Sequence, residues 1–264
     1  MAGSWYPSAP DRLAREIDRY VAEAEVAPTP APRAIVVPHA GLVYSGPVAA
    51  HAFRLVVGGG YVAVVLVGPS HFVPFTGVSI WPRGAWQTPF GDVPVAETLA
   101  DAIVRAASDV HEHPVAHRRE HSLEMELPFV ARLLPSVPIV PLVMGRQDRA
   151  TAFGLGDALA TVVADAGNVL LVASSDLSHY HDAITAHEMD QVVEHYVERL
   201  DADGLMRALE RQPDHACGGG PIVSVVHAAG RLGSTHARVL RYADSGDVNG
   251  DKSSVVGYLA AAIW

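Results

Sequence analysis

The sequence contains only one cysteine, Cys217, among its 264 residues. A single thiol cannot form an internal disulfide, which excludes a disulfide-stapled secreted scaffold and indicates a reducing compartment. Basic residues are also few: 19 Lys and Arg stand against 29 Asp and Glu, and the formal net charge is −10. The densest basic point is Arg118-Arg119, and Glu120 follows it directly. We therefore expect neither nucleic acid nor an anionic membrane as a partner.

Long apolar runs are missing as well. The longest, Tyr61–Val67 and Val255–Trp264, have the length of strands and are too short to cross a bilayer. Residues Met1–Pro7 lack the charged and apolar regions of a signal peptide, so we expect a cytoplasmic protein. Apolar residues make up 49% of the chain and charged residues 18%, which is enough to build a large core. We expect one domain over residues 1–264.

Short β-branched runs alternate with helical segments along most of the chain. This pattern is typical of an α/β fold with a mainly parallel or mixed central sheet flanked by helices. The runs are Ala34–Val37, Val62–Val67, Ile139–Val143 and Val169–Ala173. Helices are expected at Asp11–Glu25, Gly46–Leu55, Ala96–Ala107, Leu123–Leu134, Thr151–Ala166, Ala183–Arg199, Ala202–Gln212 and Pro221–Gly230.

Other features indicate local structure. Ser8 or Asp11 is expected to cap the first helix. Gly77–Trp81 and Val93–Val95 are expected to form an inserted strand pair. Two final runs flank a polar loop and predict an antiparallel hairpin, with strands at Arg238–Tyr242 and Ser254–Ile263.

Histidine is abundant, with 14 residues, and three of them follow predicted parallel strands. His39 follows the first run, His71 the second, and Asp176 and His179 the fourth. In open α/β sheets, ligands bind at this carboxyl edge of the strands. Each histidine could instead cap a helix or bond to a loop, but three at one edge favour a common site. The remaining histidines include five expected at the surface: His111, His113 and His117 in a polar loop, and His187 and His195 in a helix.

Cys217 lies in the segment His215–Pro221, just before an apolar helix. The three glycines that follow it allow the backbone to approach a ligand closely. A helix N-terminus also lowers the pKa of a thiol, which favours the thiolate as nucleophile or metal ligand. The alternative is an inert buried cysteine. Two imidazoles and a thiolate are suited to iron, copper or zinc, and not to magnesium or calcium.

A further group of polar residues spans Glu120–Pro128. His121 and Glu124 are one helical turn apart, so both could orient a ligand or bind substrate. An equally simple interpretation is that Ser122 caps a helix whose first turn favours acidic residues.

Seven segments, in order along nearly the whole chain, resemble the Memo family, which is widespread in bacteria and archaea. They are Ala2–Pro7, Pro38–Gly41 with Tyr44–Gly46, Gly68–His71, Thr88–Gly91, Glu120–Glu124, Ser174–His179 and Cys217–Gly218. The resemblance implies a fold related to the LigB-type extradiol dioxygenases, which use non-haem iron. It also implies a functional link to a radical-SAM protein, which is often encoded beside prokaryotic members.

The resemblance further implies roles for particular residues. His39, His71 and Cys217 correspond to metal ligands, and His179, with Asp176 beside it, to the acid/base of the dioxygenases. We expect the His179 ring to be fixed by Asp176 or by a nearby backbone carbonyl. We assign His121, Glu124, Tyr44 and Ser70 to substrate binding. The implied cofactor is one transition-metal ion, Fe(II) or copper, with zinc as a further option. Family members are linked to copper-dependent redox activity and to binding of phosphorylated peptides.

Cys217 takes the position of a carboxylate in the dioxygenases, so ring cleavage does not follow from the fold. Our leading hypothesis is a metal-dependent redox enzyme or oxygenase-like protein acting on a small molecule or peptide. The second is a non-catalytic module that binds a peptide, phosphorylated or not, in the same cleft. The third is a metal-free thiol enzyme with Cys217 as nucleophile, His179 as base and Asp176 as orienting group.

Overall fold

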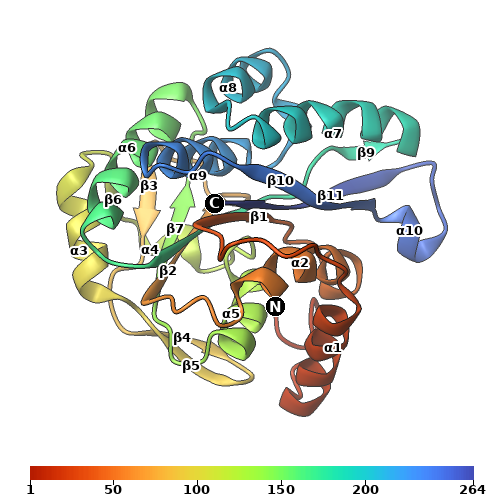
Figure 1. Ribbon diagram of the computed structural model, residues 1–264, viewed down its shortest axis with the longest axis horizontal. Coiled ribbons are helices and arrows are strands. Elements are labelled where there is room, and N and C mark those ends of the chain that lie inside the picture. Colours follow the sequence, from red (N-terminus) through yellow and green to blue (C-terminus); the bar gives the residue numbers. More distant parts are fainter.

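The computed structural model describes residues 1–264 and has one mixed sheet between two layers of helices (Figure 1). The strands lie in the order β10 (Ala237–Asp244), β11 (Val255–Ile263), β1 (Ala34–Val37), β8 (Val169–Ser174), β2 (Ala63–Pro69), β7 (Ile139–Met144), β3 (Val78–Ile80) and β6 (Val110–Glu112). A further strand, β9 (His179–His181), pairs with β11 outside this order. The predicted α/β fold, with a central sheet flanked by helices, is confirmed.

The four β-branched runs form the centre of the sheet. Strands β1, β8, β2 and β7 are parallel neighbours, as predicted. In β1, Ala34 and Val36 pack into the core on one face, and Ile35 and Val37 pack into the core on the other. Because both faces are covered, these strands are apolar except for Ser174 at the end of β8, and they do not alternate with polar residues.

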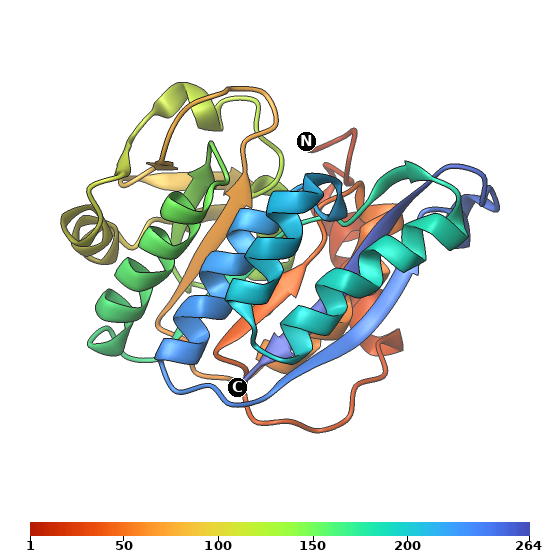
Figure 2. The same ribbon diagram turned by 90° about the horizontal axis from the view of Figure 1, so that it is seen from above.

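Five helices cover one face of the sheet and three cover the other. The first group is α3 (Glu97–Ala106), α6 (Arg149–Ala164), α7 (Ala183–Glu198), α8 (Ala202–Arg211) and α9 (Gly219–Arg231). The second group is α1 (Pro10–Glu23), α2 (Leu42–Val56) and α5 (Leu127–Leu133). Figure 2 shows the green, blue and teal helices of the first group side by side. Each helix overlaps one of the predicted segments.

The start of α1 differs from the expected one. The helix buries one apolar stripe, as its spacing predicts. However, its N-cap is Ala9, with no side-chain hydrogen bond, so the expected cap by Ser8 or Asp11 is wrong. Pro10 occupies the first helical turn, where its missing N–H and fixed φ angle are favourable. The proline therefore sets the helix start without a polar cap.

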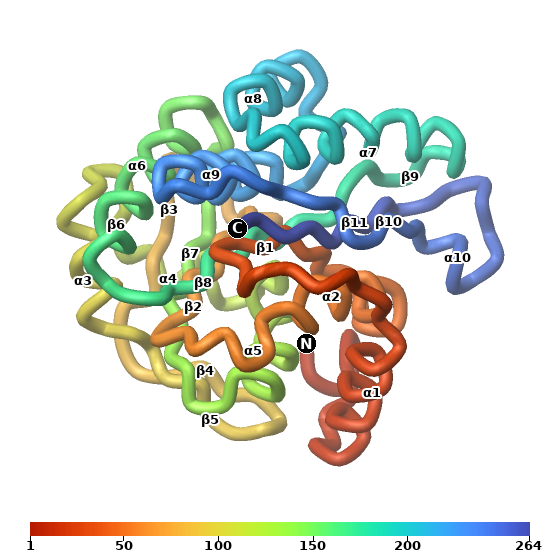
Figure 3. The backbone as a smooth tube through the Cα atoms, in the orientation of Figure 1, coloured from red at the N-terminus to blue at the C-terminus, as the bar shows by residue number.

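The C-terminal hairpin is confirmed. β10 and β11 pair antiparallel, with Tyr242 opposite Leu259. β11 also pairs antiparallel with β1, so strands near the two ends of the chain lie side by side (Figure 3). The hairpin thus extends the parallel centre of the sheet with two antiparallel strands.

The inserted strand pair was predicted with the wrong partners. β3 joins the edge of the main sheet, antiparallel to β7 and parallel to β6. A separate hairpin forms between β4 (Ala85–Thr88) and β5 (Gly91–Pro94). The Thr88 side chain closes its turn by donating to the Gly91 carbonyl and accepting from Phe90 N–H. Gly91 has φ 108°, a conformation that favours glycine, so this short turn pairs neighbouring strands locally.

The remaining elements are short: α4 (Pro114–His117), α10 (Gly246–Asn249) and the 3-10 turns Glu124–Glu126 and Pro213–His215. His117 was expected in an exposed loop, but it is buried at the end of α4, with Nε2 2.9 Å from the Ser79 hydroxyl. None of the helices combines the length and apolarity needed to cross a bilayer.

Candidate metal site

The parallel strands deliver polar residues to one edge of the sheet, as predicted. His39, His71 and Asp176 each come two residues after the end of a strand, β1, β2 and β8 respectively. His179 begins β9 and is held beside them because β9 pairs with β11. These residues line a cavity of about 550 Å³, together with Trp5, Ala40, Gly41, His121, Tyr180, Asp214, Cys217 and Val256.

Three imidazoles meet in this cavity. Each of His39, His71 and His121 offers a ring nitrogen, and these nitrogens all lie within 4.8 Å of one another. The rings of His71 and His121 stack with centroids 4.5 Å apart, and His39 meets both edge-on. This spacing brings three ring nitrogens close enough to share one cation.

His71 is held by Glu120, a residue for which the sequence pattern indicates no role. The Glu120 carboxylate accepts a hydrogen bond from the His71 backbone N–H at 2.6 Å and is 2.8 Å from its ring Nδ1. It also accepts from the backbone N–H groups of His121 and Ser122. Burial alone would raise the pKa of Glu120, but these hydrogen bonds outweigh it and lower the pKa to about 2. The ionised carboxylate therefore fixes the His71 ring and leaves Nε2 for a ligand.

His39 is fully buried and held by a different group. Its Nδ1 lies 2.9 Å from the hydroxyl of Ser174, and its Nε2 lies on the side of Cys217. Burial, followed by the neighbouring His71 and His121, lowers the pKa of His39 well below its usual value. His39 is therefore a neutral imidazole at physiological pH, which is the form that binds metals.

Either Asp176 or a nearby backbone carbonyl was expected to orient His179, and the structure gives Asp176 another contact. Its Oδ1 accepts hydrogen bonds from the backbone N–H groups of His39, at 2.8 Å, and Ala40, at 3.2 Å. The ring of His179 instead has Nδ1 2.8 Å from the carbonyl of Leu177. Burial raises the pKa of Asp176 to about 6, and the nearby His179 opposes this effect. Asp176 therefore shapes the loop that carries His39, and a backbone carbonyl orients His179.

His121 lies in the wall of the cavity with Trp5 over its ring, at 4.5 Å between centroids. Burial, followed by the neighbouring His71, lowers its pKa to about 4, so the ring is neutral. Its buried Nδ1 has no hydrogen-bond partner. We predicted a substrate contact for His121, and its position also makes it a candidate ligand.

Helix capping does not account for the polar residues of the Glu120–Pro128 segment. Ser122 was the alternative cap, but its hydroxyl donates to the carbonyl of Pro69 at 2.9 Å. Neither the 3-10 turn nor α5 has a side-chain cap. Ser122 thus ties the Glu120–Glu124 segment to the end of β2, next to His71.

Cys217 lies against His39 at the other side of the cavity. Its Sγ is 3.3 Å from His39 Nε2 and 3.5 Å from the carbonyl of Asp176. Burial, reinforced by the Asp176 carboxylate, raises the pKa of the thiol, the opposite of the effect expected from the helix N-terminus. A Cβ at Gly218 would lie 2.6 Å from the Ser174 carbonyl, so only glycine allows this close approach.

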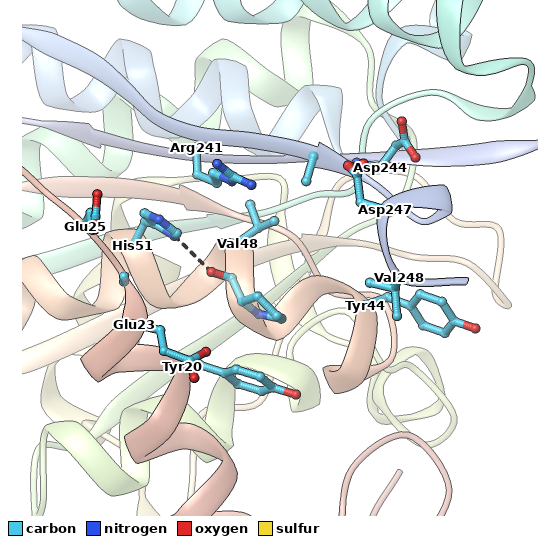
Figure 4. Close-up of a pocket in the computed structure, with 13 residues that line it drawn as sticks. Tyr20, Glu23, Glu25, Tyr44, Val48, His51, Arg241, Asp244, Asp247 and Val248 are labelled. Carbon is cyan, nitrogen blue, oxygen red and sulfur yellow. Dashed lines mark hydrogen bonds between the residues drawn. The ribbon is translucent and has the colours of Figure 1, made fainter. Parts of the chain in front are cut away.

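The structure does not place the other three predicted substrate contacts in this cavity. Ser70 donates to the carbonyl of Val73, and Glu124 accepts from the hydroxyl of Tyr6. Tyr44 lines a separate cavity of about 380 Å³ between α1, α2 and β10, shown in Figure 4. Their predicted roles in substrate binding therefore have no support from the geometry of the histidine cavity.

The residues of the cavity fit a transition-metal ion. His39 and His71 each have Nδ1 engaged by an oxygen, so Nε2 is available, and this arrangement is typical of metal-binding histidines. Cys217 supplies a soft sulfur beside His39, although it is not in the group of three ring nitrogens that lie within 4.8 Å of one another. Imidazole and thiolate donors favour iron, copper or zinc over magnesium and calcium.

Fold and site together define an α/β protein with a histidine-rich cavity at the carboxyl edge of parallel strands. The family model of Memo-like proteins matches residues 1–262, and the chain belongs to this family. It is 37% identical to a MEMO1 family protein of Thermotoga petrophila, over 100% of this chain and 98% of the relative. A MEMO1 family protein of Sulfolobus acidocaldarius is 38% identical, over 98% of this chain and 96% of the relative.

A solved structure shares the fold at low sequence similarity. It is an uncharacterized protein of Escherichia coli K12, with a TM-score of 0.52 and 16% identity, covering 76% of this chain and 85% of that one. This likeness supports the fold assignment alone.

Proposed function

We propose that the cavity binds one transition-metal ion, Fe(II) or copper, and that the protein is a metal-dependent redox enzyme. The observation that carries the proposal is the convergence of three imidazole nitrogens within 4.8 Å of one another. Two of these rings have their other nitrogen held by an oxygen, one from Glu120 and one from Ser174. The third ring, that of His121, has a buried Nδ1 without a hydrogen-bond partner, as expected of an imidazole at a ligand site.

In this proposal His39 and His71 hold the ion, and Cys217 is the third donor. Sγ already lies 3.3 Å from His39 Nε2. A thiolate offsets part of the charge of a divalent cation, and a bound cation strongly favours deprotonation of a coordinating thiol. His121 lies next to this set and is the alternative third donor, since its nitrogen meets the same distance condition as those of His39 and His71.

The side chains around the ion have separate roles. A bound iron or copper ion would supply Lewis acidity and one-electron redox chemistry. His179 would accept or donate a proton at Nε2, because its Nδ1 is engaged by the Leu177 carbonyl. The buried Asp176 carboxylate keeps the His39 backbone in place.

A second candidate function is binding of a peptide or small molecule without chemistry. Three partly exposed aromatic side chains favour it: Trp5 and Tyr180 line the cavity, and Phe72 lies beside His71 and His121. Tyr180 is 78% exposed and has φ 65°, which is uncommon outside glycine and concentrates at functional sites. Such a rim suits an aromatic or apolar portion of a ligand. Binding that persists after the metal has been removed would favour this candidate.

The test is metal titration of the metal-free chain with copper, iron and zinc in turn. We expect about one site per chain in the wild type. The His71→Ala variant should lose far more affinity than the roughly 10–100-fold caused by removing a group that only orients a ligand. The His195→Ala variant, altered at an exposed histidine on α7, is the matched control and should bind like the wild type. Equal affinity of His71→Ala and His195→Ala would overturn the proposal.

A further inference from the structure

Glu126 is a buried carboxyl group behind the site that has no charged partner. It lies in the 3-10 turn Glu124–Glu126 and is 1% exposed. Its side chain makes a hydrogen bond to Ser174 and to no Lys, Arg or His. An ionised carboxylate without a counter-charge is very costly in such a place. The hydrogen-bond partners of Ser174 determine which form of Glu126 the structure accommodates.

Ser174 connects Glu126 to His39. The Oγ atom of Ser174 has three close neighbours: the carbonyl of Ser122 at 2.6 Å, Oε1 of Glu126 at 2.7 Å and Nδ1 of His39 at 2.9 Å. All three distances are those of hydrogen bonds, and each bond needs one proton. The serine hydroxyl supplies only one proton, and its oxygen can accept two more bonds.

The chemical identity of the three neighbours of Ser174 Oγ determines which atom donates the proton in each hydrogen bond. A backbone carbonyl is only an acceptor, so the Ser122 carbonyl takes the hydroxyl proton of Ser174. Glu126 and His39 must then donate to the two lone pairs of Oγ. An ionised Glu126 would take the hydroxyl proton, and two oxygens would face each other at 2.6 Å with no proton between them.

We propose that Glu126 is protonated in the folded protein and is a positioning residue for His39, acting through Ser174. With both lone pairs of Ser174 Oγ engaged as acceptors, the His39 ring carries its proton on Nδ1 and directs the lone pair of Nε2 toward Cys217 and the cavity. The role of Glu126 in metal binding rests on the proposed function. The proton positions around Ser174 are independent of it. Burial of Glu126, and to a smaller extent the Asp176 carboxylate, also raises its pKa well above the usual value.

The proton positions can be measured on the metal-free chain. Infrared spectra at neutral pH should contain a carboxylic-acid C=O band that disappears in Glu126→Gln and persists in Glu188→Gln, the control at an exposed glutamate. Nitrogen-15 NMR of the wild-type imidazoles should show His39 protonated at Nδ1. A spectrum in which Glu126→Gln removes no acid band, or a wild-type His39 protonated at Nε2, overturns the proposal.

The role in positioning is tested by metal affinity. Ser174→Ala removes the acceptor for His39 and should lower affinity about 10–100-fold. Glu126→Gln keeps a neutral donor and should bind within about threefold of the wild type, and Glu126→Leu, which lacks the donor, should bind more weakly than Glu126→Gln. Wild-type affinity in Ser174→Ala, with the fold intact, would overturn the role. If the wild type binds no metal and yet shows the predicted proton positions, the proposed function fails and the proton assignment is supported.

Discussion

The Glu120 carboxylate contacts both the backbone N–H and the imidazole ring of His71. One carboxylate oxygen accepts the His71 N–H at 2.6 Å, and the other lies 2.8 Å from Nδ1. This double contact fixes the orientation of the ring, because the main chain and the imidazole are bound to the same rigid group. The rest of the cavity depends on it, since His121 and Ser122 are held by the same carboxylate.

Replacement of Glu120 should therefore weaken metal binding without removing a ligand. We expect Glu120→Gln to lower the affinity for copper or iron about 10–100-fold, because an amide is a weaker acceptor for the His71 ring than a carboxylate. Isothermal titration of metal-free protein measures the effect. Glu97→Gln, at an exposed glutamate, is the control. Equal affinities in the two variants would mean that Glu120 does not orient His71.

The same residue gives a prediction for pH. The pKa of Glu120 is lowered from 4.5 to about 2 in the folded protein, so its contribution to stability is present above pH 4.5 and is lost as the pH falls toward 2. Because one pKa unit corresponds to about 1.4 kcal/mol, this contribution is on the order of a few kcal/mol. Urea unfolding with a chelator present should show the stability difference between wild type and Glu120→Gln shrinking below pH 4.5. A difference that stays constant down to pH 3 would contradict the assignment.

The choice of third donor can be decided with two variants. We expect Cys217→Ser to remove thiolate-to-copper charge-transfer absorption and to lower affinity, because the ion loses its anionic ligand. His121→Ala should keep that absorption and lose less affinity. Electronic absorption during copper titration records both effects. The reverse pattern would make His121 the third donor and Cys217 a neighbour of the site.

The thiol itself should be unreactive in the absence of metal. Burial raises the pKa of Cys217, so little thiolate is present near neutral pH. Alkylation of the folded, metal-free chain should be much slower than that of a free model thiol and should accelerate after denaturation in urea. Fast alkylation in the folded state would revive the thiol-enzyme hypothesis. That hypothesis already has a difficulty, because the imidazole found against Sγ is His39, whereas the proposed base was His179.

Much of the fold could be predicted because its central strands are buried on both faces. A short, continuous apolar run such as Ala34–Val37 is typical of a strand covered on both sides, and that strand has the predicted bounds. The pairing of β3 could not be predicted, because its partners β7 and β6 are set by long-range contacts. His117 was misplaced for a related reason: its burial depends on Ser79, far away in the sequence.

The site was predictable in part. Placement at strand ends identifies His39, His71 and Asp176 without knowledge of the structure. The supporting residues Glu120, Ser174 and Glu126 could not be found this way, because an orienting contact leaves no spacing pattern in one sequence. Their only signal is proximity to residues already singled out, as with Glu120 next to His121.

The most direct test of the metal site is elemental analysis of the full chain, purified without a histidine tag and without added metal. The proposal predicts about one equivalent of iron or copper per chain in the wild type and in His195→Ala. It predicts essentially none in the His39→Ala, Cys217→Ala double variant, provided that circular dichroism shows the fold intact. Metal retained by that double variant at the wild-type level would contradict the central claim, as would a wild type that contains no metal and takes up none when it is supplied.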